Sequence, residues 1–316
     1  MRILILTAVA LFFFSKPLFA APDLDLEHRY LEVYLEINDA EHIEKKADLP
    51  AALKDFKECY EKLKSIRADS PYWETALVVH RMYDCRAKIV ELQLKLSVGN
   101  GSVPADETLA QIRANYPGPV QTGARHSYAW KSGIAIGLFW IGKDGEKRSA
   151  WDDDWMKSNG GVDSPDDRNG FSAAAHVDKL NPFYVALPFN DLAHAEAAEK
   201  WVPAAWHRQL QEGKPVSACK DRWVQVTNAE GRSCFAQWED AGPSGDDDPE
   251  YVFGKSIPKV EDKPAMSVSP AVAQYLELND DITKRVAWRF IDEADVPPGQ
   301  WLKYQEQGLI YAAMNE

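Results

Sequence analysis

Apolar residues follow two different spacings along the chain. From Glu27 to about Leu96 they recur every three or four positions, which is the spacing of amphipathic helices. The three stripes are Tyr30, Tyr34 and Ile37, then Ala52, Phe56, Cys59, Leu63 and Ile66, then Val78, Met82, Cys85, Ile89, Leu92 and Leu96. Pro50 and Pro71 suit first helical turns, so breaks are expected near Asp48 and Ser70. The pattern predicts three helices with short loops.

A second pattern begins near residue 133. Residues 98–132 are rich in Gly, Ser, Asn and Pro and read as a linker, interrupted by a short helix over Glu107–Ala114. Beyond it, short β-type runs stand at 134–142, 183–187, 222–228, 234–238 and 286–291, and one helix is expected over Pro270–Leu276 with an N-cap in 267–269. Short strands that do not alternate with helices predict a small barrel.

The helical region carries one weak repeat signal. The segment ADLPAALKDFKECYEKLKSIRADSP has an Ala-rich start, then Phe56, Tyr60 and a closing Pro71, and it resembles a tetratricopeptide repeat. Such stacks usually need three or more units for stability. The resemblance implies that the helices of 27–97 bind a protein partner or oligomerise. The alternative is a plain helical hairpin that packs on the rest of the protein.

A hairpin in the second region resembles a known barrel family. The run VQVTNAEGRSCFAQWEDAGP, residues 224–243, with SVSPAVAQYLEL and VAWRFI after it, is similar to the second half of a rare lipoprotein A-like double-psi β-barrel. Expansins and barwin-like domains are further relatives in pattern. NPFYVALPFND, residues 181–191, resembles a segment of the first half. The resemblance covers roughly 133–293, with insertions at 143–180 and 191–218, and implies six strands.

These observations divide the chain into five parts. We expect a signal peptide over 1–21, a helical, tetratricopeptide-like domain over 27–97, the linker over 98–132, the barrel over 133–293 and a C-terminal tail over 294–316. The predicted fold class is therefore a multi-domain α+β chain, in which the helical segment is followed by a six-stranded double-psi β-barrel with insertions.

The resemblance also implies a chemistry. Enzymes of that family cut peptidoglycan as lytic transglycosylases, and the acidic residue of their "D-x-G-P" turn matches Asp240. One carboxyl group suffices for this reaction, because it protonates the glycosidic oxygen and then takes a proton from the sugar's own hydroxyl. Such a group must stay protonated near neutral pH, and apolar walls such as Trp238 and Phe235 would raise its pKa. Asp191 is a second carboxylate that could reach the same groove.

Other positions depart from the family pattern. The family histidine falls on Tyr184, the arginine of the turn on Ala241, and the aspartate before the short helix on Ser267. His176 lies eleven residues before Leu187, so it does not match the histidine by position. These changes favour binding without chemistry. Asp240 then has an ordinary role as a turn-capping carboxylate.

Glu239, next to Asp240, and several aromatic residues also have expected roles. Glu239 is expected to point to the other face of the strand, as a solvated charge. Tyr184, Trp238, Trp151 and Trp155 are candidate substrate-binding residues; Trp151 and Trp155 stand among Asp and Asn and suit an exposed sugar-stacking platform. Three further tryptophans lie inside strand runs and are assigned to the core: Trp140, Trp223 and Trp288.

The first residues and the net charge indicate where the protein is located and which partners it lacks. Arg2, an apolar run near 12 residues and small residues at Ala20 and Ala21 are typical of a secretory signal. Removing Arg2 and Lys16 changes the net charge from −13 to −15, which argues against nucleic acid and anionic membrane surfaces as partners. A periplasmic or secreted protein with no membrane span after signal removal is expected; an uncleaved signal anchor is the alternative.

Cysteine and acidic residues are the candidates for disulfide bonds and metal binding. Cys59 and Cys85 would lie level across an antiparallel helix pair, so a disulfide is predicted between them. Cys219 and Cys234 remain open, because the hairpin places Cys219 opposite residue 240 or 241. The aspartate runs at 152–154 and 246–248 lack EF-hand spacing. No metal and no cofactor are expected.

Two functions remain open at this point. In the first, an exported cell-envelope protein binds, and in one version also cleaves, peptidoglycan or a related polysaccharide through its barrel. In the second, the barrel is a non-catalytic, expansin-like glycan binder, or a support for protein contacts made by the helices. Sequence alone leaves enzymatic activity, the glycan and the oligomeric state undecided.

Overall fold

A computed structural model describes most of the chain. It covers residues 24–71, 73–100, 126–143, 149–150, 153–207, 215–260, 263–278 and 284–315. The predicted signal peptide, the predicted helix at 107–114 and Trp151 lie outside these residues. Among the described helices, none is both long enough and apolar enough to cross a membrane.

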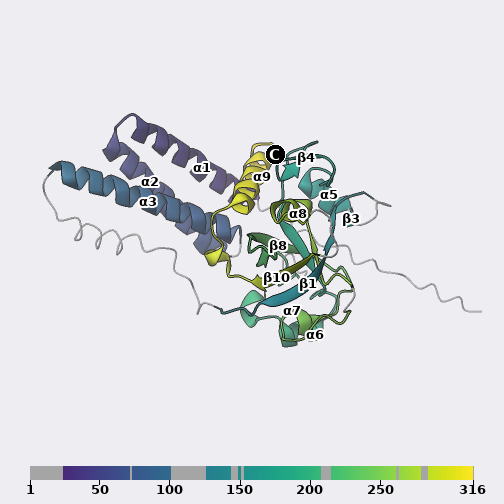
Figure 1. Ribbon diagram of the computed structural model, residues 1–316. Helices are drawn as coiled ribbons and strands as arrows, with labels where there is room; N and C mark the ends of the chain where they lie inside the picture. The colour runs from purple at the N-terminus through teal and green to yellow at the C-terminus, as the bar shows by residue number, and fades with distance from the viewer. Residues whose placement is uncertain are drawn as a thin grey trace, which may run out of the picture.

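The three predicted N-terminal helices are present. They are α1 (Leu24–Lys45), α2 (Leu49–Asp69) and α3 (Thr75–Asn100), and they lie side by side and extend away from the rest of the molecule (Figure 1). The break before α2 is where the sequence predicts it. The Asp48 side chain accepts a hydrogen bond from the Ala51 amide at 3.2 Å, and Pro50 occupies the first turn.

Six strands close into a mixed barrel, which confirms the α+β class and the six-stranded barrel. The strands are β1 (Lys131–Leu138), β6 (Tyr184–Leu187), β7 (Arg222–Thr227), β8 (Ser233–Ala241), β9 (Met266–Val268) and β10 (Arg285–Phe290), in the order β1-β10-β7-β8-β6-β9. The pairs β1–β9 and β6–β8 are parallel and the others antiparallel. When β1 is exchanged with β8, β6 with β9 and β7 with β10, the strand order around the closed barrel is the same, read in the opposite direction.

Short elements fill the loops between the barrel strands. They are β2 (Trp140–Ile141), β3 (Ser149–Ala150), α5 (Asp153–Asn159), β4 (Arg168–Asn169), β5 (Ser172–Ala173), α6 (Ala195–Trp201), η1 (Ala204–Trp206), α7 (Pro249–Val252), α8 (Pro270–Tyr275) and η2 (Glu293–Asp295). The helix predicted at 270–276 is α8, and Ser269 caps it. Trp223 and Trp288 are buried in the core as expected, whereas Trp140 is only half-buried.

Most of the segment predicted as a C-terminal tail, 294–316, forms a helix. α9 (Gln300–Asn315) lies between the helical region and the barrel (Figure 1). Glu306 accepts hydrogen bonds from Tyr30 Oη and Arg81 Nε, both at 2.7 Å. On its other side, Trp301 packs on Phe235 with ring centroids 4.9 Å apart. The N-terminal helices therefore pack on the rest of the protein.

The cysteines are free, so the predicted bond between Cys59 and Cys85 is wrong in this structure. All four thiols are buried. Cys59 Sγ turns toward Glu36 Oε2 on α1, 3.9 Å away, and burial raises the pKa of Cys59 to about 12. Burial also raises the pKa of Cys85, and a protonated thiol is a poor nucleophile for disulfide exchange. Equal distance from the turn was not enough to pair the two sulfurs.

Candidate functional site

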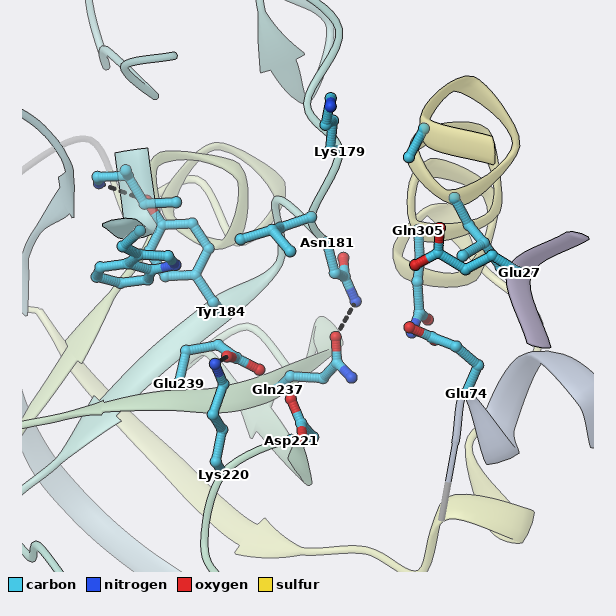
Figure 2. Close-up of a pocket in the computed structure, with 15 residues that line it drawn as sticks. Glu27, Glu74, Lys179, Asn181, Tyr184, Lys220, Asp221, Gln237, Glu239 and Gln305 are labelled. Carbon is cyan, nitrogen blue, oxygen red and sulfur yellow. Dashed lines mark hydrogen bonds and ion pairs between the residues drawn. The ribbon is translucent and has the colours of Figure 1, made fainter. Parts of the chain in front are cut away.

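A cavity of about 130 Å³ lies where the barrel meets the helices. One wall comes from the barrel and the loops that lead into it, and the other from α1, the residue before α3, and α9 (Figure 2). Its volume is below the range of about 300–1,000 Å³ that is usual for sites of drug-sized ligands. A single sugar ring or a short polar group is thus the scale of ligand that suits it.

β8 presents Glu239 to this cavity on the same face as Gln237, two residues earlier in the strand. In the pairing of β6 with β8, Val185 is opposite Trp238 and Ala186 is opposite Asp240, so the register shifts at Glu239. The Glu239 side chain is 13% exposed, and its Oε2 is 3.6 Å from Lys220 Nζ. The expectation that Glu239 is a solvated charge is therefore wrong.

Two buried amides continue the barrel wall. Asn181 Nδ2 donates to Gln237 Oε1 at 2.9 Å, and Asn181 Oδ1 accepts from the Phe183 amide at 3.0 Å. Both side chains line the cavity (Figure 2). Because Asn181 precedes β6 and Gln237 lies on β8, the parallel strand pair fixes the position of both amides.

An aromatic cluster forms the floor beside these amides. Trp155 and Tyr184 line the cavity, and their ring centroids are 5.5 Å apart. Tyr184 Oη donates to Asp163 Oδ2 at 2.8 Å and accepts from the Ile141 amide at 3.1 Å. Burial raises the pKa of Asp163 to about 6, and the neighbouring Arg168 guanidinium opposes that shift. The Tyr184 hydroxyl is thus held by the protein, and the residue lines the cavity although it is only 1% exposed.

The helix wall carries carboxyl groups of a different character. Glu74, which directly precedes α3, is half-buried, and burial raises its pKa from 4.5 to about 8; Asp221, Glu27 and Glu293 raise it further. Its backbone has φ of 41°, a left-handed conformation that is uncommon outside glycine. Gln305 Nε2 of α9 donates to Glu74 Oε2. Gln305 is 4% exposed, and its Oε1 has no hydrogen-bond partner.

The predicted catalytic carboxylates do not line this cavity in the part of the chain that the structure describes. Asp240 Oδ1 accepts from the Ala241 amide at 2.7 Å, which is the turn-capping role. Asp191 accepts from Ser217 Oγ at 2.7 Å and from the Ala218 amide at 2.6 Å. Asp191 therefore organises a loop.

The predicted substrate-binding aromatics fall into two places. Trp155 is 4% exposed, so it is no surface platform, although it does line the cavity together with Tyr184. Trp238 is 2% exposed, and its indole N–H donates to the Asp240 carbonyl at 2.8 Å. Trp238 thus serves the barrel core, and the insertion that carries Trp155 folds inward over β6.

The helix wall of the site is not evident from the sequence. Glu27 and Glu74 look like ordinary polar residues of the helical region and Gln305 falls in the predicted tail, so nothing in their spacing connects them to the hairpin at 224–243. Asp221 was missed too, although its φ of 64° marks an unusual turn before β7. The one available signal was Glu239 beside Asp240, on the strand face that it shares with Gln237.

The carboxyl groups are not arranged as a metal centre. Across the residues with described positions, no group of three or more His, Cys, Asp or Glu side chains could hold a metal ion. Of the aspartate run at 246–248, Asp248 caps α7 by accepting from the Tyr251 amide at 3.4 Å. The cavity can instead exchange protons and hydrogen bonds with a polar ligand.

In comparisons with known proteins, no protein-family model and no curated protein matches this chain.

Proposed function

We propose that this chain is an exported cell-envelope protein whose barrel binds peptidoglycan or a related polysaccharide in the cavity at residue 239. The observation that carries the proposal is the combination of groups on the barrel wall. Buried amides of Asn181 and Gln237 lie beside the rings of Trp155 and Tyr184, with the Glu239 carboxylate at the edge. Amides and carboxylates bond sugar hydroxyl and acetamido groups, and aromatic rings cover the apolar faces of a sugar.

The barrel is proposed to be of the double-psi type. Two features support this. The strand order around the barrel is kept when its two halves exchange places, and each of the two parallel pairs consists of one strand from each half. The rare lipoprotein A-like resemblance of residues 224–243 points to the same fold. The signal-like pattern of the first 21 residues supports the proposal of export.

Binding without cleavage is favoured at the positions that the resemblance implies. The Asp240 carboxylate caps its own turn, the hydroxyl of Tyr184 is engaged with Asp163, and Ser267 is 4% exposed. The helices are proposed to serve the barrel, because α1 and the start of α3 contribute Glu27 and Glu74 to the cavity. A tetratricopeptide-like role in binding a separate protein is the weaker proposal.

Cleavage is the second candidate, and one observation favours it. A pKa of about 8 keeps the Glu74 carboxyl protonated at neutral pH, which is the state that the acid of a lytic transglycosylase requires. In that version Glu74, and not Asp240, is the proton donor.

Purified peptidoglycan sacculi test both versions. The mature chain and its Glu239→Gln, Asp240→Asn and Glu74→Gln variants are sedimented with sacculi, and soluble products are resolved by mass spectrometry. Glu58→Gln on α2, whose side chain is 57% exposed, is the matched control. We expect the wild type to bind without products, Glu239→Gln to bind several-fold more weakly, and Asp240→Asn and Glu58→Gln to bind normally.

Other outcomes reject specific parts of the proposal. Anhydro-sugar ends that are lost in Glu74→Gln would establish cleavage by Glu74, and ends that are lost only in Asp240→Asn would restore Asp240 as the acid. No sedimentation of the wild type with sacculi would reject peptidoglycan as the ligand.

A further inference from the structure

The helix wall of the cavity presents hydrogen-bond acceptors and negative charge. Figure 2 shows Glu27, Glu74 and Gln305 together on this wall, facing the barrel residues Gln237 and Asp221 across the cavity. We propose that this wall binds the primary ammonium group of a small organic cation, held by Gln305 Oε1 and the carboxylates of Glu74 and Glu27.

The Gln305 side chain is the first observation. Its Nε2 is used by Glu74, and its Oε1 is buried and has no partner. A buried acceptor without a donor is unfavourable, so this atom favours a ligand that brings one. An ammonium group carries three donors and no acceptor, which suits a wall formed by a carbonyl oxygen and two carboxyl groups.

The charge of the cavity is the second observation. Four carboxyl groups line it, those of Glu27, Glu74, Asp221 and Glu239, against the two ammonium groups of Lys179 and Lys220. Lys220 lies 3.6 Å from Glu239 on the barrel wall. Carboxyl groups therefore outnumber ammonium groups two to one among the residues that line the cavity.

The form of the cation follows from the geometry. The described residues offer no cluster that could hold a metal ion, so the acidic groups are too spread for a single bare ion. The rings of Trp155 and Tyr184 and the side chain of Ile141 form an apolar wall in the same cavity. A molecule with an ammonium group at one end and an apolar or sugar body at the other fits both walls.

Glu74 couples this binding to protons. Without a cation beside it, its carboxyl is largely protonated at pH 7, since its pKa is about 8. A cation beside it favours the ionised form. Binding at pH 7 should therefore release a proton from Glu74, and this release is a readout that ordinary structural damage would not produce.

The inference deepens the proposed function and rests on it only for the identity of the natural ligand. Peptidoglycan offers primary ammonium groups from two sources, the side chains of its stem peptides and amino sugars that lack the acetyl group. Both share the chemistry that the helix wall recognises, and small probes distinguish them.

Isothermal titration of the mature chain tests the inference. The probes are n-butylammonium as the side-chain analogue, glucosamine as the amino sugar, and n-butanol and N-acetylglucosamine as uncharged partners of each. Titrations at pH 7 in two buffers of different ionisation enthalpy count the protons released. We expect at least one ammonium probe to bind about tenfold more tightly than its uncharged partner and to release protons.

Two variants and one control complete the design. Glu74→Gln replaces a largely protonated carboxyl by an amide of the same shape, so it should fold; we expect about tenfold weaker binding and no proton release. Gln305→Leu removes the unpartnered acceptor and should weaken binding to a similar degree. The exposed Glu58→Gln should change neither quantity. Melting temperatures with and without n-butylammonium provide a second readout for any variant of lowered stability.

The two proposals fail separately. Equal binding of charged and uncharged probes, or binding unchanged in both Glu74→Gln and Gln305→Leu, would overturn the ammonium site even if sacculi sediment with the protein. Selective ammonium binding with no affinity for sacculi would keep the ammonium site and reject the peptidoglycan proposal.

Discussion

At the scale of single residues, alternation along β8 decides which carboxylate meets the cavity. Gln237 and Glu239 lie two residues apart and both line the cavity, whereas Trp238 and Asp240 between and after them do not. Because Ala186 pairs with Asp240 directly after Val185 pairs with Trp238, Glu239 is inserted between the two pairs. Which residues lie beside Gln237 and Glu239 depends on the pairing with β6, a strand remote in sequence.

Tyr184 offers a residue-scale prediction. Replacing it by Phe keeps the ring but removes the donor to Asp163 and the acceptor for the Ile141 amide, at 2.8 and 3.1 Å. Leaving buried polar groups unsatisfied costs about 1–3 kcal/mol. We expect the free energy of unfolding, measured with urea, to fall by that amount while sacculus binding is unchanged.

The matched control for that variant is Tyr83→Phe, at a ring that is 42% exposed, and it should leave both quantities unchanged. Loss of binding in Tyr184→Phe at full stability would contradict our assignment, since it would mean that the hydroxyl contacts the ligand.

The site was only partly accessible to sequence reasoning. Asp240, Tyr184 and Trp155 were selected from local patterns, and two of them do lie at the cavity. Their roles differed from the expectation, because burial of Trp155 and the bond from Tyr184 to Asp163 depend on how the 143–180 insertion folds. No local pattern reports such contacts.

At the scale of elements, the spacing of apolar residues predicted the helices and strands that bury one face. The three stripes of 27–97 became α1, α2 and α3, and the runs at 183–187, 222–228, 234–238 and 286–291 became strands. β9 was not recognised as a strand because it has three residues, all buried, and so shows no alternation. The chain after residue 293 was predicted as a tail, yet it contains α9, which joins the helices to the barrel.

α9 carries the element-scale prediction. Glu306 receives hydrogen bonds from Tyr30 and Arg81, and the side chains of Glu306 and Arg81 are 14% and 22% exposed. Removing one partner of a fully buried pair costs about 3–5 kcal/mol, and partial exposure lowers that figure. We expect Glu306→Gln to reduce the free energy of unfolding by about 2 kcal/mol in urea titrations.

The exposed Glu58→Gln should change the same free energy by less than about 0.5 kcal/mol. Equal effects of Glu306→Gln and Glu58→Gln would show that α9 is not what fastens the helices to the barrel.

At the scale of the whole molecule, the helical region and the barrel meet through carboxyl groups that favour the protonated state. Glu74 lies at the centre of this contact, with Glu27 on α1, Glu293 after the barrel and Asp221 before β7 all raising its pKa. Ionised together, these groups repel one another in a setting that water screens poorly. The contact between the two regions should therefore weaken as the pH rises.

The sign and size of this effect follow from linkage. The pKa of Glu74 rises from 4.5 to about 8 on folding, so its share of stability is fully present below pH 4.5 and is lost as the pH rises to about 8. Each unit by which a pKa differs between the folded and unfolded states changes the free energy of unfolding by about 1.36 kcal/mol. The difference between 4.5 and about 8 therefore limits the contribution of Glu74 to about 5 kcal/mol. We expect urea unfolding of the wild type to show this loss between pH 5 and pH 8.5, and Glu74→Gln, which cannot ionise, to lose a few kcal/mol less. An identical pH dependence of the two proteins would mean that Glu74 is already ionised at neutral pH in the folded chain.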